Sequence, residues 1–241
     1  MPVDVLAIAA HPDDVELTCG GTLARLKAGG YRFGIVDLTR GEMGTRGSAE
    51  IRGTEARRAA QILGAEFRES LDLGDGGLGK HGREEELAII DVIRRHQPRV
   101  VLAPYPDDRH PDHRRAGQLV TDASFYAGLR KLATAHAAHR PQQTVYFPTF
   151  DPQPPEFVVD ITPYIETRRA AMRAFESQFH DPSSTEPPTI LSQRDFLDMV
   201  ESRARQHGAL IGVEFGEGFL SRRPPRVDDL VKAFAGFEPG F

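Results

Sequence analysis

Two short segments of the chain combine histidine with aspartate at spacings that suit a metal site. The first is His11-Pro12-Asp13-Asp14, and the second is His110-Pro111-Asp112-His113. Imidazole nitrogen and carboxylate oxygen are good zinc ligands, and catalytic zinc sites combine three protein ligands with one open position for water. The first segment offers two such ligands, so a third must come from the second. The pattern predicts a divalent-metal site, provided that the fold brings the two segments together.

The rest of the chain alternates between strand-like and helix-like patterns. Continuous apolar runs predict buried strands, and apolar residues three or four positions apart predict helices. The expected strands are residues 3–10, 32–38, 65–71, 99–103, 144–147 and 157–161. The expected helices are residues 22–28, 49–63, 84–95, 116–132, 163–179 and 192–211, with a mobile loop at 181–188. The alternation favours an α/β fold with a Rossmann-like, mostly parallel sheet flanked by helices and an irregular C-terminal part. No segment has the composition of a linker, so residues 1–241 are expected to form one domain.

The order of the strands decides whether the two segments meet. Right-handed crossovers place the first four strands in the spatial order 3-2-1-4, so the first and fourth are neighbours. Open α/β sheets bind ligands at this switch point, so we expect His11, Asp14 and His113 to converge there. Each segment alone also has a structural interpretation, in which Asp13, Asp14 or Asp112 caps a helix. The position of both segments at neighbouring strand ends favours the metal site.

Composition argues against several other classes of protein. The net charge of −5 disfavours nucleic acid as a partner. The single cysteine, Cys19, excludes an intramolecular disulfide and a cysteine-rich zinc site. The longest apolar run, residues 5–10, is far below the ~20 residues of a membrane helix. No signal peptide is recognisable, so we expect a cytoplasmic protein without membrane contact. Acidic residues in the first loop, with no glycine-rich motif, disfavour a dinucleotide site.

The sequence AHPDD at residues 10–14, with HPDH at 110–113, resembles the PIG-L/LmbE-type N-acetylglucosaminide deacetylases. Residues 39–78, 157–179 and 204–219 resemble the branch that deacetylates N-acetylglucosaminyl-malate in bacillithiol biosynthesis. The resemblance implies a zinc-dependent hydrolase that releases acetate from a small amino-sugar conjugate, with GlcNAc-malate as the expected substrate. The alternatives are GlcNAc-inositol, a chito-oligosaccharide or an antibiotic intermediate as substrate, or a non-catalytic sugar- or metal-binding protein.

The resemblance also implies roles for individual residues. The implied metal ligands are His11, Asp14 and His113. They would hold Zn²⁺, although such a ligand set also accepts Fe²⁺, Co²⁺ or Mn²⁺. The implied catalytic residues are Asp13 as general base, His110 as oxyanion stabiliser or proton donor, and Asp112 as the residue that holds the His110 ring.

Three further residues are expected to contact the substrate. Arg52 and Arg109 would pair with the malate carboxylates, which suit the planar arginine fork, and Asp75 would contact a sugar hydroxyl. The chain departs from the family at Gln206-His207, where a tyrosine is frequent. The role of that tyrosine is either vacant or passes to His207.

The resemblance finally implies a homo-oligomer, often a hexamer. In the tail at residues 218–241, three exposed-looking phenylalanines could serve an interface or dock on their own subunit: Phe234, Phe237 and Phe241.

Overall fold

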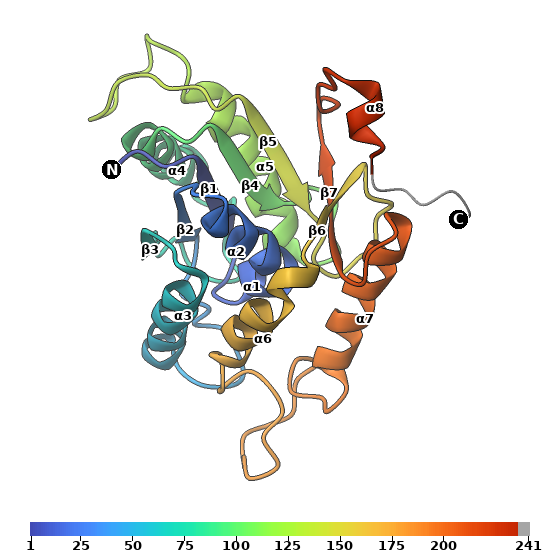
Figure 1. Ribbon diagram of the computed structural model, residues 1–241. Coiled ribbons are helices and arrows are strands. Elements are labelled where there is room, and N and C mark those ends of the chain that lie inside the picture. Colours follow the sequence, from blue (N-terminus) through green and yellow to red (C-terminus); the bar gives the residue numbers. More distant parts are fainter. Residues whose placement is uncertain (236–241) are drawn as a thin grey trace.

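The computed structural model describes residues 1–235, which form a central sheet with helices on both faces (Figure 1). The strands are β1 (Val5–Ala9), β2 (Phe33–Asp37), β3 (Phe67–Ser70), β4 (Val100–Pro104), β5 (Gln143–Phe147), β6 (Phe157–Asp160) and β7 (Gly216–Ser221). The helices are α1 (Asp14–Thr18), α2 (Gly20–Ala28), α3 (Ala49–Leu63), α4 (Arg83–His96), α5 (Pro111–Tyr126), α6 (Ile165–Arg173), α7 (Phe196–Leu210) and α8 (Leu230–Ala233). A single 3₁₀ turn, Thr162–Tyr164, leads into α6.

The strands of the described residues hydrogen-bond in the order β3-β2-β1-β4-β5-β7-β6. The first five run parallel, whereas β7 is antiparallel to both β5 and β6. The predicted order 3-2-1-4 and the predicted α/β fold class are therefore confirmed. Leu6 of β1 lies opposite Val101 of β4, so the segments that follow these two strands leave the sheet at the same edge.

Strand β1 divides its side chains between two hydrophobic cores. Val5, Ala7 and Ala9 belong to a core shared with α2, α3, α6 and α7. Leu6 and Ile8 belong to the core on the other face, which includes α4 and α5. Alternate residues of a strand point to opposite faces, and a parallel strand covered on both faces reads as a continuous apolar run. This accounts for the uninterrupted hydrophobic pattern at the start of the chain.

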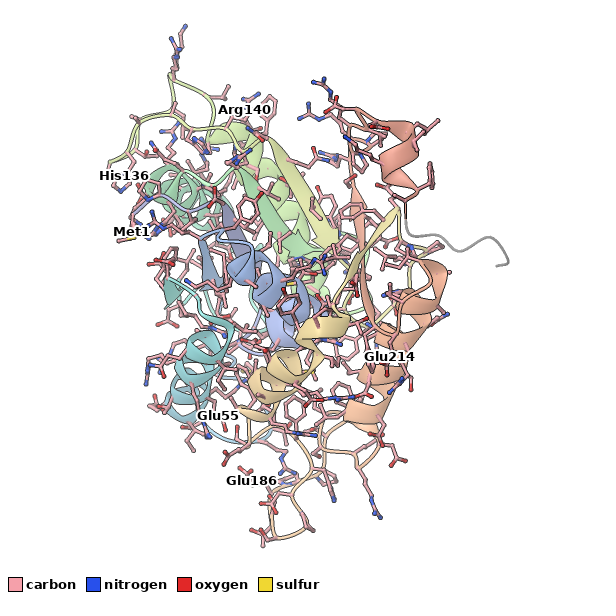
Figure 2. All side chains as sticks on the ribbon, viewed as in Figure 1. Met1, Glu55, His136, Arg140, Glu186 and Glu214 are labelled. Atoms are coloured by element: carbon pink, nitrogen blue, oxygen red, sulfur yellow. The ribbon has the colours of Figure 1, made fainter. Side chains whose placement is uncertain are left out.

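Helix α5 carries His113 and differs in extent from the expected helix at 116–132. It begins at Pro111, which occupies the first turn, and His110 is the N-cap residue; proline is well suited to this position. It ends at Tyr126. Arg140, labelled in Figure 2, donates to the carbonyl of Phe125. The helix therefore starts at the metal-site motif itself.

Gly117 allows α5 to approach the end of β4 closely. A Cβ added at Gly117 would lie 2.5 Å from the carbonyl oxygen of Pro104, a distance that real Cβ atoms do not tolerate. The missing side chain thus brings the helix that carries His113 against the loop that follows β4.

The C-terminal part is more regular than expected. Strand β7 was not predicted, because glycines at 216 and 218 conceal its pattern, yet it completes the sheet between β5 and β6. Helices α6 and α7 are shorter than the expected 163–179 and 192–211, and residues 181–188 lie outside helices and strands. Phe234 is exposed, while Phe237 and Phe241 lie outside the described residues. No helix in the described part of the chain is both long and apolar enough to span a membrane.

Candidate metal centre and active site

His11, Asp14 and His113 meet at the carboxyl ends of β1 and β4. The Nδ1 atom of His11 lies 3.3 Å from Nε2 of His113, which lies 3.2 Å from Oδ1 of Asp14. All three side chains are buried, and their ligand atoms lie within 4.8 Å of one another. Tetrahedral zinc with bonds of about 2.0–2.1 Å separates neighbouring ligand atoms by about 3.3 Å. The donor types and their spacing therefore fit a divalent cation.

The other ring nitrogen of His11 faces two carboxylates. Its Nε2 lies 3.1 Å from Oδ1 of Asp75 and 3.5 Å from Oδ2 of Asp112. Metal-binding histidines commonly donate their second N–H to a carboxylate, which fixes the tautomer and the ring orientation. His11, Asp75 and Asp112 also lie close enough together to hold a cation. However, the Asp75 and Asp112 carboxylates accept backbone N–H groups from Met43 and Gly76, respectively. This suits carboxylates that support a metal-binding histidine better than carboxylates that bind the metal themselves.

The three candidate ligands have strongly shifted pKa values. Burial lowers the pKa of His113, but the carboxylates of Asp14 and Asp108 outweigh it and raise the value to about 9. Burial raises the pKa of Asp14, yet His113 and His11 together hold it well below its usual range. The carboxylates thus favour positive charge on the His113 ring, and the two histidines favour the ionised form of Asp14.

Asp13 lies beside this cluster in a strained conformation. Its φ of 107° falls in the left-handed region, which costs a non-glycine residue about 1–3 kcal/mol and is typical of functional sites. It precedes α1 but makes no capping hydrogen bond with its side chain, so the capping interpretation fails for Asp13. Burial raises the pKa of Asp13 to about 7, although Arg52 opposes this shift. A carboxyl group with this pKa can take up and release a proton near neutral pH.

Arg52 holds Asp13 from α3. Its Nη2 donates to Oδ2 of Asp13 at 3.0 Å and to the carbonyl of Pro12, while Nη1 donates to the carbonyl of Gly41. Arg52 is only 5% exposed. Both terminal nitrogens of its fork are thus engaged within the protein, which differs from the expected contact with a substrate carboxylate.

His110 caps α5 and presents its ring to the site. Its Nδ1 accepts the backbone N–H of Asp112 at 3.2 Å, so in the neutral ring the proton resides on Nε2. Burial and the neighbouring His113 and His11 lower the pKa of His110, which favours this neutral form. The Asp112 carboxylate does not hold the ring as expected: it accepts the N–H of Gly76 and faces His11 instead. His110 can therefore donate from Nε2.

All nine predicted site residues line one cavity of about 770 Å³: His11, Asp13, Asp14, Arg52, Asp75, Arg109, His110, Asp112 and His113. Its lining also includes apolar side chains that the sequence did not single out: Met43, Phe150, Ile190 and Leu191. The exposed Arg109 lies over the Phe150 ring at 4.6 Å.

Asp108 contacts the site although the sequence did not single it out, whereas His207 lies outside the cavity. Asp108 is buried and contacts the site, and the only hint of this was its place in the acidic stretch before His110. His207 does not line the cavity: its Nδ1 accepts the N–H of Gly218 at 3.0 Å. It therefore does not replace the tyrosine that is frequent in that stretch.

The chain is similar to several known proteins. Residues 6–124 match the family model described as PIG-L: GlcNAc-PI de-N-acetylase. A diacetylchitobiose deacetylase of Thermococcus kodakarensis is 36% identical over 191 residues, which cover 73% of this chain and 70% of the relative. The conserved protein TT1542 from Thermus thermophilus is 39% identical, with a TM-score of 0.86 over 95% of this chain and 98% of that chain. The N,N'-diacetylchitobiose deacetylase from Pyrococcus horikoshii is 30% identical, with a TM-score of 0.78 over 91% and 83% of the two chains. The chain therefore belongs to the PIG-L family, as its AHPDD and HPDH motifs predicted.

Proposed function

We propose that this chain is a divalent-metal-dependent N-deacetylase that releases acetate from an N-acetylglucosamine conjugate. The observation that carries the proposal is the buried cluster of His11, Asp14 and His113, with Asp13 and His110 in the same cavity. The deacetylases among its relatives support the same reaction class. Zinc is the proposed cation because the ligand set of two histidines and one aspartate suits it.

A cation held by these three residues would lower the pKa of a bound water toward about 7 and polarise the acetamide carbonyl. Asp13 accepts a proton from the attacking water, and Arg52 keeps its Oδ2 in place for this task. His110 donates from Nε2 to the oxygen that becomes negative, a type of contact worth about 3–4 kcal/mol in the transition state. The C–N bond then breaks, and the leaving amine takes up the proton that Asp13 accepted from the water, while neutral His110 keeps its Nε2 proton.

We further propose that the group attached to the sugar is uncharged, as in a chito-oligosaccharide, rather than malate. Malate would bring two carboxylates into the cavity. Two arginines line the cavity. Arg52 is engaged with Asp13 and backbone carbonyls, so only Arg109 would remain to pair with the two carboxylates. The lining also contains the apolar side chains of Met43, Phe150 and Ile190, which suit the face of a second sugar ring better than two carboxylates.

The test is an acetate-release assay on N,N'-diacetylchitobiose, GlcNAc-inositol and GlcNAc-malate, with metal removed by a chelator and then restored. We expect activity that depends on the metal, with the highest kcat/KM on a substrate that has an uncharged aglycone. A preference for GlcNAc-malate would overturn the proposed aglycone. Failure to release acetate from any of the three by the metal-loaded protein would contradict the deacetylase function.

A further inference from the structure

Asp108 is a buried carboxylate that lies just before the HPDH motif. It follows β4 and is only 3% exposed, which is uncommon for an aspartate unless its oxygens are paired. Its position in the loop places it behind His113, away from Asp14 and His11, the other members of the candidate metal cluster.

The two oxygens of Asp108 contact two different parts of the site. Oδ1 accepts the backbone N–H of His110 at 2.8 Å and faces Nδ1 of His113 at 3.5 Å. Oδ2 accepts the hydroxyl of Thr149 and the backbone N–H of Phe150 at 3.3 Å. Asp108 therefore joins the metal-site helix to the loop between β5 and β6.

The Nδ1 atom of His113 is buried and has no hydrogen-bond partner among the described residues. Asp108 is the carboxylate that faces it, and its negative charge favours an N–H at this position. A proton on Nδ1 leaves the lone pair on Nε2, the atom that faces His11 and Asp14. This is the tautomer that a metal ligand at Nε2 requires.

The loop held by Asp108 supports the same ring. Phe150 stacks on His113 with a centroid distance of 5.6 Å and an interplanar angle of 6°. Arg203 also donates to the carbonyls of Thr149 and Phe150, so the loop has a second anchor that does not involve Asp108.

We propose that Asp108 is a positioning residue, which holds His113 in the tautomer and orientation needed for metal binding. The inference rests on the proposed metal-dependent function. Asp108 acts on the metal through His113, and the backbone N–H groups of His110 and Phe150 keep its own carboxylate in place.

The test compares wild type, Asp108→Asn and the matched control Thr149→Val, which removes the loop hydrogen bond but leaves the carboxylate behind His113. Zn²⁺ affinity is measured by chelator competition, and the Co²⁺-loaded proteins are compared by visible absorption. Outer partners of metal-binding histidines typically contribute about 10–100-fold in affinity. We expect Asp108→Asn to weaken zinc binding by this factor and to alter the Co²⁺ spectrum, while Thr149→Val stays close to wild type.

Equal zinc affinity of Asp108→Asn and wild type would overturn the inference alone. An equal loss in Thr149→Val would also overturn it, because the loop would then be the cause. Absence of zinc binding by wild type would instead overturn the proposed function, and the inference with it. Imidazole ¹⁵N spectra of the zinc-loaded wild type need no variant: the proton of His113 is expected on Nδ1, and a proton on Nε2 would refute the assignment.

Discussion

The carboxylate of Asp75 lies 3.1 Å from Nε2 of His11, while Nδ1 of the same ring faces His113 at 3.3 Å. A single imidazole thus links the candidate metal ligands to an outer carboxylate. The second oxygen of Asp75 accepts the N–H of Met43, so both oxygens already have partners within the protein. This arrangement indicates support of His11, rather than the sugar contact implied by the family resemblance.

Replacement of Asp75 by Asn tests these two roles against each other. A carboxylate that supports a metal-binding histidine should affect metal affinity, so we expect the Kd for zinc to rise by about tenfold or more. KM should change little once the metal is saturating. Chelator competition and steady-state kinetics measure the two quantities. A raised KM with unchanged zinc affinity would restore the sugar-contact role.

Replacement of Arg52 by Lys keeps the charge but removes the planar fork. Because Arg52 binds Asp13 and two carbonyls, we expect kcat to fall by about tenfold or more while KM changes little, as expected when ground-state substrate binding is unaffected. The exposed Arg57 of the same helix offers a matched control, Arg57→Lys, which should leave both parameters unchanged. A rise in KM alone would identify Arg52 as a substrate contact.

Substitution of two helical glycines by alanine should have opposite effects on stability. In Gly117→Ala the new Cβ meets the Pro104 carbonyl oxygen, and overpacking of this kind costs about 1–3 kcal/mol. In Gly53→Ala the new Cβ would meet, among the described residues outside the helix's own backbone, only the flexible end of Arg57 at 3.7 Å, so the gain in helix propensity of about 0.5–1 kcal/mol should appear. Urea unfolding measures both. An unchanged free energy of unfolding in Gly117→Ala would mean that α5 does not approach β4 as closely as described.

The sequence pattern was sufficient to predict the fold and the convergence of the candidate metal ligands, because both follow from strand order. His11 and His113 each come after a recognisable apolar strand, and right-handed crossovers make those strands neighbours. Strand β7 escaped prediction because Gly216 and Gly218 carry no side-chain pattern. Its antiparallel position depends on tertiary contacts, such as the tight approach of His207 to Gly218.

The finer roles in the site could not be predicted, because they depend on the angles at which elements pack. Arg52 reaches Asp13 only because of the way α3 lies against the first loop, which sequence spacing does not encode. Asp112 is near His110 in sequence, but the start of α5 turns its carboxylate toward Gly76 and His11. Asp108 gave no signal beyond its acidity, since its partners Thr149 and Phe150 follow a different strand.

His207 should make stability depend on pH. Burial, Arg203 and Arg168 lower its pKa below the usual 6.5, and its Nδ1 must stay unprotonated to accept from Gly218. Between the folded pKa and 6.5 the unfolded chain binds more protons, so the free energy of unfolding rises with pH across this window. His207→Gln should remove this contribution, so wild type should lose stability relative to the variant between pH 7.5 and pH 5.

The measurement is urea unfolding of wild type and variant at both pH values, with exposed His81→Gln as the control. An identical difference between wild type and His207→Gln at the two pH values would contradict the contribution of His207.

The most direct test of the metal-dependent mechanism is metal content measured together with acetate release for wild type, Asp13→Asn and His113→Ala. Asp13 lies beside the ligands without being one of them, so Asp13→Asn should keep one zinc per chain and lose about 10²–10⁴-fold in kcat, the range of general acid–base catalysis. His113→Ala should lose both metal and turnover. Near-normal deacetylation by Asp13→Asn, or full activity of wild type after complete removal of metal, would contradict the mechanism.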